Sequence, residues 1–279
     1  MQTETQHYLI AAIFTMVGAL VAMLGFFKLK TYLIIKDTPR SKIRSMAMGI
    51  VEIHGTIACF ENNLIKTPFS KTDCVYYKYE IEEYRQHTSG SGKNRRTEHR
   101  WDTVAWGDKG IPFMAKDDTG EVYVDPHGAE TYITKNKGFY LEKQGLLAGF
   151  GGIGNLVKAL RHWDGKDMSG LAEIEVMDLR PLSQRTGLKM TRVGDRRFLE
   201  YYIEPGDTLF LLGTAANNRN VPQEVLIKKG ENEKTFIISD REEMGVLKEL
   251  KKSMLVALIF GSIFFIVGVI MFLKITGIV

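Results

Sequence analysis

The chain has 279 residues, of which 44% are hydrophobic and 25% are charged, and its formal net charge is +4 at pH 7. This length and apolar content are sufficient to bury a core, so an intrinsically disordered chain is excluded. The only two cysteines, Cys59 and Cys74, exclude a disulfide framework and a zinc-binding ring of several cysteine and histidine ligands.

Two segments have the length of membrane spans. Tyr8 to Phe27 and Met254 to Leu273 are each twenty residues without a charge, and about 20 apolar residues cross the hydrocarbon core of a bilayer. The residues before the first segment contain no Lys or Arg, and no cleavage site follows Phe27, which favours an uncleaved anchor over a signal peptide. We therefore expect an integral membrane protein with transmembrane helices at 8–27 and 254–273.

The distribution of basic residues predicts the topology. They gather on the inner flanks of the two segments, and only Lys274 lies beyond the second; the flanking residues are Lys28, Lys30, Lys36, Arg40, Lys42, Arg44, Lys248, Lys251 and Lys252. The positive-inside rule then places the intervening domain in the cytoplasm, at the cell membrane, where the cysteines would be reduced. If the topology is the opposite one, a structural disulfide between Cys59 and Cys74 remains an alternative. Because anionic lipid accounts for this flanking charge, we expect membrane lipids and no nucleic acid as partners.

Small residues four positions apart occur in both spans. They are Gly18 and Ala22 in the first span and Ala257 and Gly261 in the second. This spacing lets membrane helices approach closely. It favours either packing of the two helices on each other or a homo-oligomer formed through them.

The first half of the intervening region is typical of strands. Residues 50–57 and 74–84 are rich in β-branched and aromatic types, and 101–106 resumes the pattern. The polar, Gly- and Ser-containing tract between Arg85 and Arg100 predicts a mobile loop that joins a long hairpin. Residues 111–115 and 121–125 flank a turn at 116–120, which predicts a second hairpin.

The second half predicts one helix and further strands. A helix is expected from Asn155, which would be its cap, with Leu156, Leu160 and Trp163 on one face. Strands are expected at 171–179, 198–204, 208–212, 225–228 and 235–239, and a short helix at 244–252 leads into the second span. We predict an α+β fold, with one β-rich domain at 37–240 between the two transmembrane helices.

Several phrases of the sequence resemble a known family. They are Thr38 to Ser45 with Ala47, Gly49, Val51 to Ile53 and Gly55; Pro68 with Cys74, Tyr76 and Tyr77; Asp118 to Gly120 with Val124 to Glu130; and Glu204 to Asp207 with Gly213 to Ala215. In this order, between two anchors, they are similar to the GIDE domain, also called the beside-a-membrane domain.

The resemblance implies a role in protein modification or recruitment. Eukaryotic members are mitochondrial ubiquitin or SUMO ligases whose activity comes from a separate carboxy-terminal RING. Here Val279 follows the second span by six residues, so this chain resembles the short prokaryotic members without a RING. The expected function is a non-catalytic scaffold that recruits a protein partner at the bilayer. Two alternatives stay open: a ubiquitin-ligase-like role implied by the family, and a module that senses anionic lipid.

Two segments are candidates for such contacts. A glycine-rich, apolar segment between 146 and 160 is expected either to touch the membrane or another subunit, or to pack on the sheet as a helix; the candidate interaction residues are Leu146, Leu147, Phe150, Ile153 and Leu156. In the loop, five basic residues are expected either to contact phosphate groups, such as those of lipid head groups, or to lie in solvent at the loop tip. These candidate lipid-contacting residues are Arg85, Lys93, Arg95, Arg96 and Arg100.

No catalytic, cofactor-binding or metal site is expected. Gly149 to Gly154 fits GxGxxG, but the run of strands around it does not provide the repeated strand-helix units of a dinucleotide fold. The acidic turns at Asp117, Asp118 and Asp125 are expected to shape the backbone rather than to catalyse.

Overall fold

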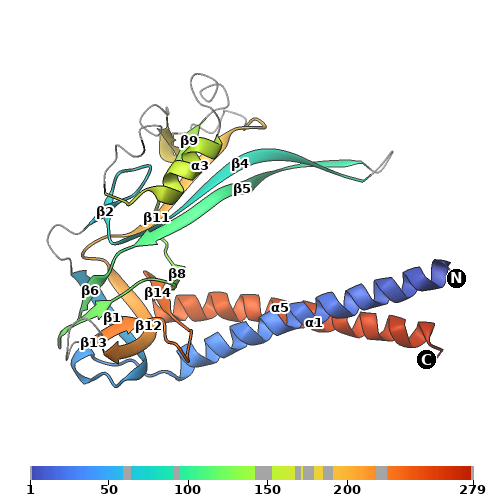
Figure 1. The fold of residues 1–279 in the computed structure, drawn as a ribbon, viewed down its shortest axis with the longest axis horizontal. Coiled ribbons are helices and arrows are strands. Elements are labelled where there is room, and N and C mark those ends of the chain that lie inside the picture. The colour runs from blue at the N-terminus through green and yellow to red at the C-terminus, as the bar shows by residue number, and fades with distance from the viewer. Residues whose placement is uncertain are drawn as a thin grey trace.

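A computed structural model describes residues 2–58, 64–90, 95–141, 153–166, 171, 179–184, 191–217 and 225–277. It shows a mixed α+β protein with an apolar helix at each end and a β-rich middle (Figure 1). This confirms the predicted fold class.

The terminal helices form an antiparallel pair. Helix α1 spans Gln2–Asp37 and α5 spans Glu243–Ile275; both are long and apolar enough to cross a membrane, which indicates a two-pass membrane protein. They lie side by side, with the N- and C-termini at the same end (Figure 1). The helix predicted at 244–252 is therefore not separate but continuous with the second span.

Small residues permit the close approach of α1 and α5. A Cβ added to Gly18 would lie 2.3 Å from the backbone nitrogen of Phe265, and one added to Gly261 would lie 2.4 Å from that of Ala22. These positions admit no side chain, so the predicted packing of the two helices on each other is what the structure shows. Homo-oligomerisation stays a prediction.

The part of the domain nearest the helices is a small barrel. Five strands close into a ring in the order β1-β6-β7-β13-β12, because β12 pairs with β1. Two further strands, β14 and β8, continue from β12. The bounds are β1 Gly49–Ala58, β6 Phe113–Lys116, β7 Glu121–Val124, β8 Glu130–Tyr132, β12 Thr208–Asn217, β13 Val225–Lys228 and β14 Ile237–Ser239.

A second, open sheet lies beyond the barrel. Its order is β10-β9-β11-β4-β5, and all its pairings are antiparallel. The bounds are β4 Tyr76–Ser89, β5 Arg96–Gly110, β9 Asn136–Leu141, β10 Arg180–Pro181 and β11 Arg196–Ile203, with a separate small ladder of β2 Ile65–Lys66 and β3 Asp73–Cys74. The domain also contains two short 3-10 helices, η1 Ile43–Ser45 and η4 Leu182–Gln184.

Each sheet has its own apolar core, and two strands belong to both. Tyr76 on β4 and Ile203 on β11 face the barrel core, whereas their neighbours Tyr77 and Tyr202 face the core of the second sheet. Successive strand residues point to opposite sides. The same strands therefore link the two cores.

Helix α3, Ile153–His162, covers the second sheet. Leu156 and Leu160 are buried with Trp163 in the core of that sheet, as the predicted helical face requires. The prediction of Asn155 as a cap is wrong, because the helix already begins at Ile153. The strand predicted at 171–179 lies mostly outside the described residues.

A third apolar cluster joins the barrel to the helices. Ile35 of α1 and Val246 and Leu250 of α5 pack against Phe210 and Leu212 of β12, together with Ile237 of β14. The side chains of β12 that point away from the barrel core thus form the seat of the membrane helices.

Candidate interaction site

The strand β5 forms one edge of the second sheet. It is fifteen residues long and pairs with β4; within the described part of the chain no strand pairs with its other side. A long unpaired strand edge offers free backbone N–H and C=O groups to another chain. The edge of β5 is therefore a ready surface for adding a strand.

Trp106 projects from this edge into solvent. Its side chain is 69% exposed, although Ala105 next to it is buried. The register of the β4–β5 ladder shifts between Ile81 and Glu82, so that Val104 is left without a partner of its own. Such a bulge redirects the side chains that follow it.

A pocket of about 330 Å³ lies beside Trp106. Its wall is largely aromatic and its rim carries two cations; the lining residues are Tyr77, Tyr79, Trp106, Gly107, Asp108, Lys109, Leu160, Arg161 and Trp163. The Lys109 Nζ atom donates to the Trp163 carbonyl oxygen at 2.7 Å. Gly107 leaves room for the Tyr79 ring, because a Cβ atom at position 107 would lie 2.8 Å from that ring.

The chemistry of this pocket suits a protein side chain. Aromatic walls bury apolar area. Arg161 and Lys109 together exceed the single carboxylate of Asp108, so the charged groups of the lining favour a negatively charged side chain. Trp, Tyr and Arg are the residues that dominate binding energy at protein interfaces. Burial raises the pKa of the Tyr79 hydroxyl, which therefore stays neutral and can donate a hydrogen bond.

Beyond the sheet, β4 and β5 continue as a projecting two-stranded arm. Arg85 pairs with Arg100 and Ser89 with Arg96, so the predicted mobile loop is a paired ribbon over most of its length. Its polar composition reflects two solvent-facing sides rather than a lack of structure. The arm leaves the body of the domain on the side toward which the helix ends run (Figure 1).

Contacts between aromatic rings stabilise the base of the arm. The Tyr84 ring lies 5.9 Å from the ring of His99 and 5.2 Å from that of Trp101, and the Arg197 guanidinium carbon lies 4.6 Å from the Trp101 ring centroid. These contacts compensate for the marginal stability of an isolated two-stranded ribbon.

Four of the five candidate lipid-contacting residues, Arg85, Arg95, Arg96 and Arg100, lie on this arm. Arg85 pairs with Glu83 and Arg100 with Asp102, both at 3.0 Å. Arg95 and Arg96 make no ion pair with an acidic residue in the described part of the chain. Lys93 lies outside the described residues.

The candidate apolar segment is only partly described. Leu156 is fully buried under α3, so it is a core residue and not part of an exposed surface; this is the sheet-packing alternative. Of Ile153 only the backbone is described, as the first residue of α3. Leu146, Leu147 and Phe150 lie outside the described residues, as does most of the GxGxxG match.

The acidic turns serve the backbone. Asp117 accepts hydrogen bonds from the N–H groups of Ile43, Thr119 and Gly120, and the Thr119 hydroxyl adds another. Although partial burial acts to raise it, these donors lower the pKa of Asp117 to about 2. Asp125 likewise accepts from the Nδ1 atom of His127 within its own turn.

The second cysteine is not placed for nucleophilic chemistry. Cys74 is a free, fully buried thiol, and burial raises its pKa strongly, so it stays protonated. Cys59 lies outside the described residues. Among those that are described, no group of three or more His, Cys, Asp or Glu side chains could hold a metal ion.

One titratable pair lies between the barrel and the helices. Glu52 is 1% exposed, and its Oε1 atom lies 3.3 Å from the Nε2 atom of His54. Burial raises the pKa of Glu52 to about 7, with Glu243 raising it further and Arg40 opposing. Burial and Arg40 lower the pKa of His54. The joint thus contains one buried carboxyl group with a raised pKa.

Comparison with protein-family models, with curated proteins and with solved structures found no match to this chain.

Proposed function

We propose that this chain is a membrane-anchored interaction module of the GIDE type, whose second sheet recruits a protein partner at the bilayer surface. The observation that carries the proposal is the exposed Trp106 on the free edge of β5, beside an aromatic pocket with a cationic rim. The domain faces the cytoplasm at the cell membrane, in keeping with the basic flanks of both helices.

The partner is an extended protein segment with an acidic or aromatic side chain. Its backbone pairs with the outer edge of β5, which supplies affinity independently of sequence. The side chain enters the pocket, where Arg161 and Lys109 select for negative charge. Burial of Trp106 in this contact removes the largest exposed aromatic surface of the second sheet from water.

The test is site-directed photo-cross-linking of the full-length protein in native membranes. A photoreactive residue at position 106 is expected to give a defined protein adduct, and one at Met244, which is 72% exposed near the start of α5, to give none. Arg161→Glu should reduce the adduct at least tenfold. Equal adducts at 106 and 244, or no effect of Arg161→Glu, would contradict the proposal.

The arm supports a second candidate, contact with anionic lipid. Arg95 and Arg96 have no acidic partner among the described residues, and the arm projects on the side toward which the helix ends run (Figure 1). Arginine near an anionic bilayer contributes about 1 kcal/mol per charge. A fluorophore on Thr97→Cys, with Cys59→Ser to avoid a second label, should be quenched by headgroup-labelled lipid in anionic nanodiscs. Salt or Arg95→Gln with Arg96→Gln should abolish this quenching; quenching that ignores both would rule the contact out.

A further inference from the structure

The two apolar spans meet the aqueous side at the same level. Phe27 ends the first uncharged segment and Met254 begins the second, and between them the Lys28 Nζ atom donates to the Ser253 hydroxyl oxygen at 3.1 Å. Residues 28–37 of α1 and 243–253 of α5 continue beyond this level toward the barrel. If the two uncharged segments fill the hydrocarbon, this bond lies at the boundary between hydrocarbon and head groups.

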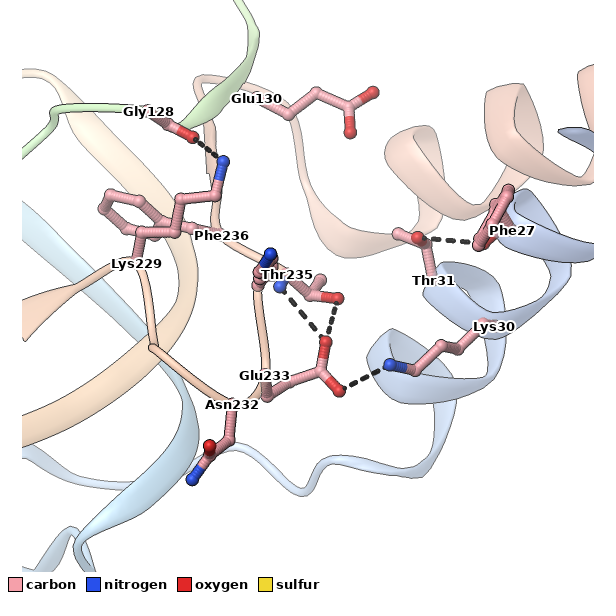
Figure 2. Close-up of a pocket in the computed structure, with 11 residues that line it drawn as sticks. Phe27, Lys30, Thr31, Gly128, Glu130, Lys229, Asn232, Glu233, Thr235 and Phe236 are labelled. Carbon is pink, nitrogen blue, oxygen red and sulfur yellow. Dashed lines mark hydrogen bonds and ion pairs between the residues drawn. The ribbon is translucent and has the colours of Figure 1, made fainter.

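A pocket of about 360 Å³ opens at this boundary, between α1 and the loop that joins β13 to β14 (Figure 2). Its lining residues are Phe27, Lys30, Thr31, Gly128, Glu130, Lys229, Asn232, Glu233, Lys234, Thr235 and Phe236. Lys30 and Thr31 stand about 4 to 6 Å above Phe27 along the helix. The head-group layer is roughly 5 to 8 Å deep, so the α1 wall of the pocket spans it.

The charges of the pocket are unevenly satisfied. Lys30 pairs with Glu233 at 2.9 Å, and the backbone N–H and hydroxyl of Thr235 also donate to Glu233. Lys229 reaches only a neutral acceptor, the Gly128 carbonyl oxygen at 3.2 Å (Figure 2). Lys234 has no acidic partner in the described part of the chain.

The carboxylate of Glu130 forms no ion pair with the described lysines of the pocket. Glu130 accepts a hydrogen bond from the Tyr132 hydroxyl at 2.6 Å, and that bond leaves its charge unneutralised. The site thus combines two lysines that can bind a phosphate with a carboxylate that can bind an ammonium group. Phe27 adds an apolar wall on the membrane side.

We propose that this pocket binds the head group of one membrane phospholipid, with Lys229 and Lys234 on the phosphate and Glu130 on a primary ammonium group. The chemistry is that of a phosphodiester joined to an amine, and the level of Phe27 makes a bilayer lipid the source rather than a soluble phosphoamine. The inference concerns a site apart from the second sheet and depends only on the membrane placement of α1 and α5.

The experiment is native mass spectrometry of the full-length protein released from nanodiscs that contain phosphatidylethanolamine, phosphatidylcholine and phosphatidylglycerol. Wild-type protein is expected to retain one phosphatidylethanolamine. Lys229→Gln with Lys234→Gln should lower its retention about tenfold. The matched control, Lys251→Gln with Lys252→Gln, removes two exposed charges at the same membrane level on α5 and should leave retention unchanged.

Two further arms separate the alternatives. Glu130→Gln should shift retention from phosphatidylethanolamine toward phosphatidylglycerol; an unchanged ratio overturns the ammonium contact. Soluble phosphoethanolamine that competes as well as the lipid overturns the bilayer source. Equal losses in the pocket and control variants overturn the site itself.

Resistance to alkaline extraction reports membrane insertion separately, and the thermal unfolding midpoint reports folding. A failure of either is thus distinguished from a failure of the head-group site.

Discussion

The barrel and the second sheet differ in whether their outermost strands are paired. In the barrel, the pairing of β12 with β1 closes five strands into a ring, and the outward side chains of β12 lie against the membrane helices. The second sheet keeps β5 open and extends β4 and β5 as an arm. The first region therefore fixes the domain to its anchors, and the second is free to meet other molecules.

The largest effect is expected at the joint between barrel and helices. Leu250→Asp places a charge in the apolar cluster with Phe210 and Val246, which should lower the free energy of unfolding by roughly 3 to 5 kcal/mol. Thermal unfolding in mild detergent measures this loss. Lys251→Asp changes the adjacent, exposed position and should cost little. If both variants unfold alike, the cluster is not what holds the domain to the helices.

A smaller, pH-dependent effect is expected from Glu52. Its pKa is raised from 4.5 to about 7 in the folded protein, so folding favours the protonated form and stability is lost as pH rises from about 4.5 through 7. At about 1.4 kcal/mol per pKa unit, the full cost is about 3 kcal/mol. Glu52→Gln should match wild type near pH 4 and exceed its stability by that amount near pH 8.

Chemical denaturation at several pH values measures this difference. Glu98→Gln, at an exposed carboxylate on the arm, serves as the control and should keep the wild-type profile. A Glu52→Gln protein that retains the wild-type slope would show that another group governs the pH response at the joint.

The smallest effect on stability is expected at the edge of the second sheet. Trp106→Ala should change the free energy of unfolding by less than about 0.5 kcal/mol, because the ring is mostly in water. Phe198→Ala, at a fully buried ring in the same sheet, should cost roughly 3 to 5 kcal/mol. Comparable losses in the two variants would mean that Trp106 serves folding rather than binding.

Local pattern was sufficient for the elements of the fold but not for their closure. Uncharged runs predicted both terminal helices, and β-branched and aromatic runs predicted β1, β4 and β11. The ring, however, depends on the parallel pairing of Leu226 with Tyr123, which lie far apart in the chain. No local sequence pattern predicts such a pairing, because it depends on how the strands pack around a shared core.

The candidate sites were harder to predict for three physical reasons. The bulge at Val104, two residues before Trp106, depends on the register between β4 and β5, and no feature of the local sequence predicts it. The membrane-boundary pocket gathers residues from three separate segments. The sequence marked Phe27 as the end of a span, Lys30 as a flanking charge and Glu130 as part of a phrase, but it did not show that they lie together. Leu156 shows a third difficulty. The sequence of an apolar helix face is the same whether the fold covers that face or leaves it exposed.

The bond between Lys28 and Ser253 joins α1 to α5 where both helices leave their uncharged segments. A domain on a single helix can swivel about that helix, whereas one held on two adjacent helices and seated through Ile35 and Leu250 cannot. The domain thus keeps a fixed orientation relative to the helix pair. In the proposed function, a partner confined to the same membrane diffuses in two dimensions and meets a β5 edge of fixed orientation, so part of the orientational entropy is lost before binding begins.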